Sequence, residues 1–556
     1  MKDQAENLRV FAVESGVIDQ DVARQMEQAQ KPAVILPGGP VSISKSAADL
    51  FGYIASSHKL FLRDGNVSQV IDENGVLKLE LLKPAAACSR FEDFVRFVKR
   101  TVGKDGKENL VSEVISKEMA EKYLAAGARR LLPVIDGLLS CPLITERNGR
   151  LHIVKSGYDP ITKLLITKEV KIVEVALPDA VHALKSLLKD YHFQTPGDRS
   201  RALASFITPA LKFGGFIRGY IPADAAEADL SQSGKTYRQQ KIAAVYNDTC
   251  AVVTKQESTG VGSVEETFSS ALIEGRPFIQ FDNLRGKFSF QGLESFMTAN
   301  GSFPARRAYS GVINIDPSKF MIMISSNGYQ TTPDLANRSS IIRIFKRQDY
   351  EYTPWVHNGV NRGYMLDFVK AAQPYLLSCV FAVVREWYTR GKPTTSEVRH
   401  DFRDWCQICD WILQNLFGEA PLMDGHKEAQ NRVSNPDHTF LRAVANELSA
   451  SGRIEEALRA TEIYELCCQK PIYIPGLNAD HQRDEKTAVT LLGKILGRVF
   501  GEKDVVVVDA FEISRSERKA ISGAMHTFPG KFYTFTRLDG SKPALPKTAA
   551  ECETAG

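Results

Sequence analysis

The sequence contains no apolar run that approaches the roughly 20 residues needed to span a bilayer. Its first residues also lack the apolar core of a signal peptide. Neither sign of charge is in large excess, because 70 Lys and Arg residues oppose 66 Asp and Glu residues and leave a formal net charge of +4. So small a charge does not require a polyanionic partner, and any nucleic-acid site must be local. We therefore expect a cytoplasmic protein that does not bind membranes.

Cysteine is scarce: the chain has 9, scattered and odd in number. This argues against a disulfide framework. Cys406 and Cys409 have the spacing of a metal knuckle, but no second Cys or His pair lies at the distance that a zinc finger needs. The segment 401–413 around them has the apolar spacing of a helix. We expect both thiols on the buried face of that helix rather than at a zinc ion.

A glycine is also missing from the most informative motif. Residues 229–236 read Asp-Leu-Ser-Gln-Ser-Gly-Lys-Thr, a phosphate-loop pattern with Asp229 in place of its first glycine. An expected strand at 215–221 precedes the motif and an expected helix at 237–246 follows it, which is the context that a phosphate loop requires. Because that glycine often adopts a backbone angle that other residues resist, we expect this loop to begin with a different shape.

The rest of the motif would contact a nucleoside triphosphate and its magnesium ion. Backbone N–H groups at a helix N-terminus face an anion. Lys235 would hold the β- and γ-phosphates, and Thr236 would bind Mg²⁺. We expect the ATP-binding residues to be Gln232, Ser233, Gly234, Lys235 and Thr236.

An acidic residue ends the next apolar strand pattern. Asp282 closes the run Pro-Phe-Ile-Gln-Phe-Asp, as expected for the aspartate that holds Mg²⁺ in a nucleotide-hydrolysing motor. Asn283 stands where many such motors have the glutamate that orients water, and an amide cannot take a proton. Either another carboxylate does that work or turnover is slow. Glu265 and Glu266 are candidates, with Glu266 included in the expected catalytic set, although both could instead form the charged first turn of a helix.

Two more residues complete the expected catalytic set. Asn327 closes the apolar pattern at 320–324 and would reach the γ-phosphate and the attacking water, unless it is only a turn residue. Arg338 follows in Asp-Leu-Ala-Asn-Arg. An arginine here would point at the nucleotide of the next subunit and stabilise charge in the transition state. Arg343 could take that role, or simply cover the strand expected at 341–345.

Two arginines lie on an insert between these strand patterns. Arg306 and Arg307 occur in the segment 298–311, which also carries Gly and Pro. We expect a hairpin that contacts the phosphates of DNA. The alternative is a solvated loop.

In this order, the motifs resemble those of AAA+ motors of the superfamily-three helicase kind, in particular the helicase portions of poxvirus-type and of phage or mobile-element primase-helicases. In those proteins the basic insert is the pore hairpin that draws DNA through a ring. The resemblance implies ATP and Mg²⁺ as cofactors, single-stranded DNA in a pore, and a homo-oligomer, expected to be a hexamer. It is closest over residues 195–347, is weaker over 364–537, and does not identify the N-terminal part as a primase.

We therefore expect a multidomain α/β protein. Its N-terminal part, at 1–175, is an α+β domain whose role the sequence does not indicate. An AAA+ P-loop core with a parallel sheet and preceding helices follows at 176–350, and then a helical domain at 351–454. The last parts are a winged-helix-like domain that binds duplex DNA at 455–540 and a disordered tail at 541–556. Within these parts, the sequence pattern predicts helices at 91–101, 364–388 and 395–417, and a polar turn at 514–519.

Several functions stay open at this point. The first is an ATP-dependent DNA helicase or translocase of phage or mobile-element replication type. The alternative is a degenerate AAA+ protein that binds nucleotide, assembles on DNA and recruits other factors with little hydrolysis, which Asp229 and Asn283 favour. A motor that acts on protein or packages DNA is a third.

Overall fold

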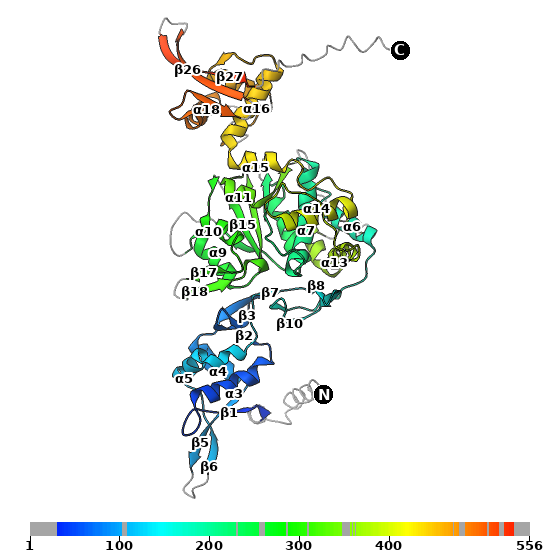
Figure 1. Ribbon diagram of the computed structural model, residues 1–556, viewed down its shortest axis with the longest axis vertical. Helices are drawn as coiled ribbons and strands as arrows, with labels where there is room; N and C mark the ends of the chain where they lie inside the picture. Colours follow the sequence, from blue (N-terminus) through cyan, green and yellow to red (C-terminus); the bar gives the residue numbers. More distant parts are fainter. Residues whose placement is uncertain are drawn as a thin grey trace.

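The computed structural model describes residues 30–102, 108–228, 232–254, 262–284, 287–307, 311–327, 329–346, 356–357, 360–361, 363–470, 472–477, 484–508, 511–521 and 527–538. The described part is elongated, with three bodies stacked along its long axis (Figure 1). An N-terminal body lies at one end, a larger body in the centre, and a C-terminal body, coloured yellow to red, at the other end. Separate hydrophobic clusters fill the three bodies. The expectation of a multidomain α/β protein is confirmed.

The N-terminal body is built around a small sheet of order β1-β5-β6, covered by three helices. The elements are β1 (Ala33–Ile35), α3 (Ile43–Ala55), α4 (Pro84–Glu92), β5 (Arg96–Val102), β6 (Glu108–Ser112) and α5 (Lys117–Ala125). The helix expected at 91–101 is wrong, because α4 ends at Glu92 and β5 follows. Phe97 and Val98, which fitted a helical spacing, are buried in the sheet, where aromatic and β-branched side chains pack well.

Short strands join the N-terminal body to the central one. They are β2 (Leu60–Arg63), β3 (Asn66–Glu73), β4 (Val76–Leu81), β7 (Gly137–Leu139), β8 (Leu143–Arg147), β9 (Arg150–Val154), β10 (Gly157–Asp159) and β11 (Leu164–Ile166). The buried guanidinium of Arg63 donates to the carbonyls of Leu272 and Ile273 in the central body. The backbone N–H of Leu79 donates to the carbonyl of Glu274 at 2.9 Å. Side-chain and backbone hydrogen bonds therefore both cross this junction.

A six-stranded sheet of order β12-β21-β13-β19-β15-β14 forms the centre of the molecule. Its strands are β12 (His192–Phe193), β13 (Ala223–Ala228), β14 (Ala251–Val253), β15 (Phe278–Leu284), β19 (Met321–Asn327) and β21 (Ser339–Phe345). All pairings are parallel except that of β12 with β21. The expected central parallel sheet is confirmed. Because parallel strands end at one edge, the residues at and after the carboxyl ends of β13, β15 and β19 meet there.

The strand that leads into the phosphate loop is not the expected one. Residues 215–221 form no strand, whereas 223–228, with the sequence Ala-Asp-Ala-Ala-Glu-Ala, form β13. This strand lies between β19 and β21, and every residue in it is buried. The prediction failed because Asp224 and Glu227 are depleted residue types in strands and are seldom fully buried.

Layers of helix cover both faces of the sheet. On one face, α6 (Leu177–Ser186), α7 (Pro196–Phe213), α8 (Lys235–Val245), α13 (Gln373–Thr389) and α14 (Arg403–Ile412) share a core with the sheet. On the other face, α9 (Val264–Ile273), α10 (Gln291–Met297) and the hairpin of β17 (Phe303–Arg307) and β18 (Gly311–Ile315) do the same. The helices α13 and α14 thus pack on α7, which lies against the central sheet.

Two expected helices are shorter than their patterns. The segment 364–388 divides into α12 (Met365–Ala371) and α13, which are bent by 76°. Pro374 lies in the first turn of α13 and has no N–H to continue the preceding helix. In the segment 395–417, α14 begins only at Arg403, because Glu397 accepts hydrogen bonds from the N–H groups of Val398 and Arg399 and holds a turn.

The thiols of α14 lie as expected. Cys406 is 0 % and Cys409 1 % exposed, on the buried face of the helix, and burial raises the pKa of the Cys409 thiol to about 12. Among the described residues, no single helix has the length and apolarity needed to cross a membrane.

The C-terminal body combines helices with a sheet of order β24-β27-β26-β25. Its elements are α16 (Pro436–Ala450), β24 (Ala457–Leu458), α17 (Ala460–Gln469), α18 (Glu485–Phe500), β25 (Val505–Val508), β26 (Phe511–Ile521) and β27 (Thr527–Arg537). Buried residues of α16 belong to this core, so the body begins ahead of residue 455. The polar turn expected at 514–519 is wrong, because these residues pair with β27 in a long hairpin. The tail at 541–556 lies outside the described residues.

Candidate functional site

The phosphate-loop motif lies between β13 and α8. Asp229, which replaces the first glycine, falls outside the described residues. In the described part of the loop, Gln232 and Gly234 have φ angles of 62° and 84°, and Gly234 caps α8. A positive φ is uncommon for a side chain such as that of Gln232. Ser233 Oγ is buried, with no hydrogen-bond partner among the residues that the structure describes.

Thr236 and Asp282 are in direct contact. Thr236 Oγ1, in the first turn of α8, donates to Asp282 Oδ1 of β15 at 2.9 Å. Ser325 Oγ, on β19, donates to the same carboxylate oxygen and lies 3.1 Å from Thr236 Oγ1. Three oxygen-bearing side chains from three elements therefore converge. The sequence did not indicate a role for Ser325, because a serine within an apolar strand pattern is not specific to any kind of site.

Lys235 and Asn327 form the second contact of the cluster. Lys235 Nζ donates to Asn327 Oδ1 at 2.6 Å. Lys235 is 9 % exposed, whereas Asn327, the last residue of β19, is exposed. The structure thus brings together Lys235, Thr236, Asp282 and Asn327 at one edge of the sheet.

The chemistry of this cluster fits a triphosphate with Mg²⁺. Hydroxyl and carboxylate oxygens are the ligands that Mg²⁺ prefers, so Thr236 and Asp282 would hold the ion. The ammonium group of Lys235 and the N-terminus of α8, which has 11 residues, both favour anionic phosphate. The hydroxyl of Ser233, which has no partner among the described residues, supplies a further donor in the same loop.

A buried polar network lies under the phosphate loop. Asp224 of β13 accepts hydrogen bonds from Arg238 and, at 2.8 Å, from Gln239, both on α8. Gln239 Nε2 also donates to the carbonyl of Ile324 at 2.9 Å, and Gln280 Nε2 donates to Gln239 Oε1 at 2.7 Å. The network joins α8 to β13, β15 and β19. It therefore positions the helix that follows the phosphate loop over the ends of the strands that carry the other site residues.

A second buried carboxylate lies at the end of β13. Glu227 accepts from Arg432 of α15 (His426–Ser434), with Nε 3.3 Å from Oε1 and Nη2 bonded to the other oxygen. Arg343 Nε lies 3.9 Å from Glu227, and its guanidinium carbon lies 5.2 Å from the ring centre of Phe345. Arg343 thus contacts its own strand and β13, as its structural alternative predicted.

Glu266 acts as a helix cap. Its carboxylate accepts from the backbone N–H of Gly262 at 2.6 Å, while Ser263 Oγ accepts from the N–H of Glu266 at 3.2 Å. Ser263 is thus the N-cap of α9, and Glu266 binds the backbone N–H of the residue just before that cap. Among the described residues, no hydrogen bond or ion pair joins Glu266 to the cluster. The side chain of Asn283 lies outside the described part of the chain.

Arg338 lies at the opposite edge of the sheet. It follows α11 (Pro333–Asn337), and its backbone carbonyl accepts from the N–H of Ala223, at the start of β13. Its guanidinium donates to the carbonyl of Glu294 at 2.6 Å and lies 3.6 Å from the carboxylate of Asp334. Arg338 is therefore remote from the phosphate loop of its own chain.

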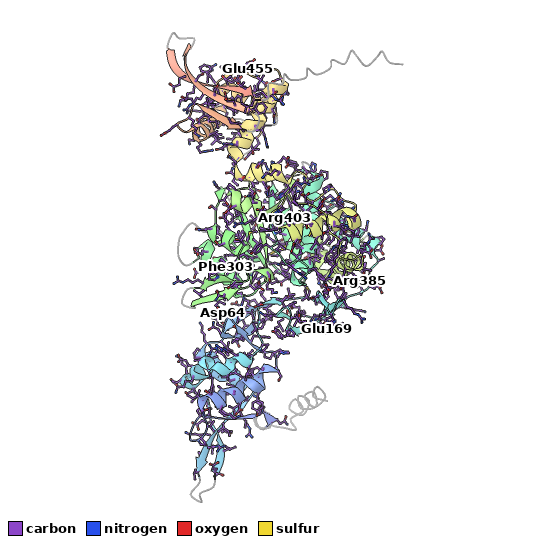
Figure 2. The ribbon with its side chains drawn as sticks, viewed as in Figure 1. Asp64, Glu169, Phe303, Arg385, Arg403 and Glu455 are labelled. Atoms are coloured by element: carbon purple, nitrogen blue, oxygen red, sulfur yellow. The ribbon has the colours of Figure 1, made fainter. Side chains whose placement is uncertain are left out.

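The expected hairpin is present, formed by β17 and β18. Arg306 is exposed on it, whereas the side chain of Arg307 is outside the described residues. Asn314 of β18 donates from its backbone N–H and its amide to Asp64 Oδ2, at 2.8 and 3.1 Å. Figure 2 labels Asp64 and Phe303 on either side of this junction. The hairpin thus contacts the N-terminal body directly.

Comparison with known proteins finds little. No family model matches the chain, and no curated protein matches it. The chain is similar to the C-terminal region of NrS-1 in its A-form apo structure, with 11 % identity and a TM-score of 0.36, over 88 % of this chain and 99 % of that one. It is also similar to SCCmec type IV Cch, described as an active helicase, with 11 % identity and a TM-score of 0.27, over 86 % of this chain and 98 % of that one. Similarity this low is no basis for assigning an activity.

Proposed function

We propose that the protein is an ATP-dependent DNA helicase or translocase of phage or mobile-element replication type, which works as a homo-oligomeric, hexameric ring. One observation carries the proposal. Four residues from three separate motifs, Lys235 and Thr236, Asp282, and Asn327, are joined by the hydrogen bonds Lys235–Asn327 and Thr236–Asp282. A chance Gly-Lys-Thr in a loop has no reason to lie against the polar ends of two neighbouring strands.

Each residue of the cluster has a separate task in ATP hydrolysis. Lys235 Nζ offsets the charge of the terminal phosphates, and Thr236 and Asp282 hold Mg²⁺. Asn327, whose amide has both donors and an acceptor, orients the attacking water. When bound, MgATP would provide the phosphoryl group, and its Mg²⁺ would offset the charge on the phosphate oxygens.

The position of Arg338 supports a site shared between subunits. β13 has 6 residues, so its two ends lie about 17 Å apart at about 3.3 Å per residue. Arg338 is at the start of that strand and the phosphate loop is at its end. An arginine so placed cannot reach the nucleotide of its own chain, but it can reach that of a neighbour in a ring.

DNA would be contacted at two places. The exposed hairpin with Arg306 and Arg307 suits single-stranded DNA in the pore. The C-terminal body, with its long β26–β27 hairpin and the exposed Lys486 and Lys494 of α18, suits duplex DNA. A forked-duplex unwinding assay with ATP separates this proposal from a motor that acts on protein.

The test of the shared site is the ATPase rate of Lys235→Ala and Arg338→Ala. Both variants should lose nearly all phosphate release, because one removes phosphate contacts and the other removes transition-state charge, worth about 10³–10⁵ in rate when supplied by an arginine finger. Mixing the two inactive variants should recover part of the activity, since some interfaces then contain one intact lysine and one intact arginine. Full activity in both single variants would refute the assignment.

A second candidate is a degenerate AAA+ protein that binds ATP, assembles on DNA and hydrolyses little. The local hydrogen bond of Glu266 favours it, because this carboxylate is occupied by the backbone N–H of Gly262, just ahead of its own helix. The residue after Asp282 is an amide and not a carboxylate. Tight MgATP binding by the unaltered protein with negligible phosphate release, in the presence of single-stranded DNA, would favour this candidate over the motor.

A further inference from the structure

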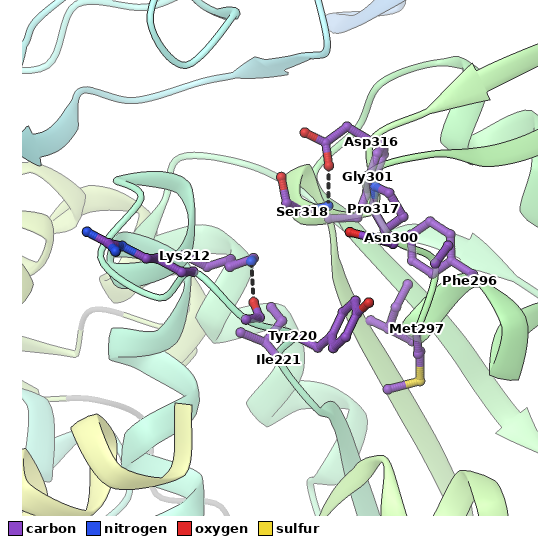
Figure 3. A pocket seen from close by; sticks show the side chains of 15 residues that line it. Lys212, Tyr220, Ile221, Phe296, Met297, Asn300, Gly301, Asp316, Pro317 and Ser318 are labelled. Atoms are coloured by element: carbon purple, nitrogen blue, oxygen red, sulfur yellow. Dashed lines mark hydrogen bonds between the residues drawn. The ribbon is translucent and has the colours of Figure 1, made fainter. Parts of the chain in front are cut away.

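A cavity of about 420 Å³ lies at the edge of the central sheet that is remote from the phosphate loop (Figure 3). Its walls come from the end of α7, from the segments that immediately precede β13 and β19, and from α10 with the segment that follows it. A cavity of this size accommodates a small organic ligand. The lining residues that bear on its chemistry are Lys212, Arg218, Tyr220, Phe296, Asn300 and Asp316.

Tyr220 presents a fixed aromatic surface at this cavity. Its hydroxyl donates to the carbonyl of Thr298 at 3.0 Å, and its ring centre lies 5.6 Å from that of Phe402. The side chain is nevertheless 36 % exposed. Figure 3 shows the ring between Ile221 and Met297. Because the hydroxyl bond and Phe402 already restrain the ring, stacking a flat ligand on it costs little further side-chain freedom.

Cationic groups lie beside this aromatic surface. Lys212 Nζ donates to the carbonyls of Ile217 and Gly219, at 3.3 and 2.6 Å. An ammonium group has three N–H donors, and these two bonds use two of them. Burial lowers the pKa of Lys212 to about 8, so a bound anion would stabilise its charged form. Arg218 adds a second, exposed cation.

One acidic side chain also lines the cavity, but it has partners of its own. Asp316 accepts from the backbone N–H of Ser318 at 2.9 Å and lies 3.7 Å from the ammonium group of Lys319. Its charge is therefore partly offset locally. The cavity as a whole combines a flat apolar wall with a positive rim.

The cavity is also the root of the arginine-bearing hairpin. Asn300 and Gly301 line it just before β17 begins, and Asp316 lines it just after β18 ends. The cavity therefore lies where the hairpin with the exposed Arg306 joins the rest of the central body. The position is independent of the nucleotide loop, which lies at the other end of β13, about 17 Å away.

We propose that this cavity binds one nucleotide unit of a single-stranded nucleic acid, with its base stacked on Tyr220 and its phosphate beside Lys212 and Arg218. Stacking on an aromatic side chain next to a positive groove is how proteins hold single strands with little sequence preference. The proposal rests on the proposed function only in placing a DNA strand at this face, and it requires no ATP hydrolysis. A free mononucleotide also has a base and a phosphate. The test must therefore distinguish a single strand from a free mononucleotide.

The experiment measures fluorescence anisotropy of the full-length protein with a labelled oligothymidylate and with an abasic strand of the same length. The unaltered protein should prefer the strand with bases. Tyr220→Ala should weaken oligothymidylate binding about 10-fold, within the range for loss of one stacked base, and leave abasic binding unchanged. Tyr220→Phe keeps the ring and should retain both the affinity and the preference.

The remaining outcomes are equally definite. Equal affinity of Tyr220→Ala and unaltered protein for oligothymidylate would overturn the proposal, as would equal losses with both strands. Competition by thymidine monophosphate as strong as that by the oligonucleotide would replace the strand with a free mononucleotide. ATP binding, measured separately, should be unchanged in Tyr220→Ala and lost in Lys235→Ala, so failure of the ATP site is distinguishable from failure of this one.

Discussion

At the scale of single residues, the phosphate-loop region depends on charges that are almost completely buried. Asp224 and Arg238 have side chains that are 1 % and 0 % exposed. Such a pair adds little net stability over an apolar replacement, but removing one partner leaves the other charge without compensation. The pair therefore acts mainly by holding α8 in one position on β13, below the residues that would contact phosphate.

Replacing Asp224 with Ala should lower the free energy of unfolding by about 3–5 kcal/mol, because Arg238 is then buried without its partner. The measurement is urea denaturation of the full-length protein, followed by the fluorescence of Trp387 and Trp405 in the adjoining core. The double variant Asp224→Ala/Arg238→Met should be more stable than the single one. An additive further loss would show that the two charges do not compensate each other.

The control is an exposed arginine–carboxylate pair. Arg453 Nε lies 2.9 Å from Glu456 Oε2, with side chains 40 % and 48 % exposed. Glu456→Ala should cost less than about 1 kcal/mol, since exposed ion pairs contribute little.

At the scale of elements, the contact between α15 and β21 depends on two buried histidines. His426 Nε2 lies 3.0 Å from the carbonyl of Ser339 and 3.4 Å from the amide nitrogen of Ile341. His400 packs on it, with ring centres 5.5 Å apart, and accepts from the N–H of Phe402 at 3.0 Å. Burial lowers the pKa of His400 to about 4 and that of His426 well below its ordinary value.

The lowered pKa values of these two histidines make the stability of the fold depend on pH. Between pH 6.5 and about 4 the unfolded chain binds a proton at His400 that the folded protein refuses, so stability falls as the pH falls through this window. His400 alone should account for about 3 kcal/mol of that loss, from 1.36 kcal/mol per pKa unit. In His400→Asn, the amide oxygen can still accept from the N–H of Phe402. The free energy of unfolding, measured by urea denaturation, should therefore fall less steeply between pH 6.5 and about 4 than in the unaltered protein. An unchanged slope would contradict the assignment.

The β17–β18 hairpin is the other element with a measurable role. Arg306→Ala/Arg307→Ala should weaken single-stranded DNA binding and reduce the salt slope of log K by roughly one unit per lost phosphate contact. Anisotropy titrations over a series of salt concentrations give this slope. Arg403→Ala, which removes an exposed arginine elsewhere on the central body (Figure 2), is the control and should leave the slope unchanged. The hairpin has no role in phosphate binding if the double variant behaves like Arg403→Ala.

At the scale of the whole molecule, the C-terminal body is packed as a unit that includes α16. Phe440, Leu441 and Val444 of that helix are buried against the core of α17 and α18. The preceding helix, α15, instead contacts α11 and the central sheet. The break between the two bodies therefore falls near Asn435, where α15 ends and α16 begins.

This packing predicts how the chain tolerates truncation. A protein ending at Ser434 should stay monodisperse and keep its MgATP binding, because no core is cut. A protein ending at Ile454 should aggregate or bind a hydrophobic dye, because α16 then exposes its apolar face. Gel filtration and dye fluorescence check both. Equal behaviour of the two truncations would contradict the boundary, and unchanged duplex affinity in the shorter protein would dismiss duplex binding by the C-terminal body.

The sequence by itself determined those features that depend on near neighbours. The helix after the phosphate loop, the strands that carry Asp282 and Asn327, and the hairpin between them all follow from local apolar spacing and turn residues, although β15 continues past Asp282 to Leu284. Because parallel strands must end at a common edge, those motifs also implied a joint site before any coordinates were known.

Tertiary structure alone decided the identity of β13, the network around Asp224, the participation of Ser325 and the position of Arg338 relative to the loop. A strand with two carboxylates is stable only because Arg238 and Arg432 neutralise them, and Arg432 lies more than two hundred positions along the chain from Glu227. Local sequence patterns cannot predict contacts between residues so far apart in the chain. The cavity beside Tyr220 is of the same kind, since its walls come from segments that approach each other only when the sheet has formed.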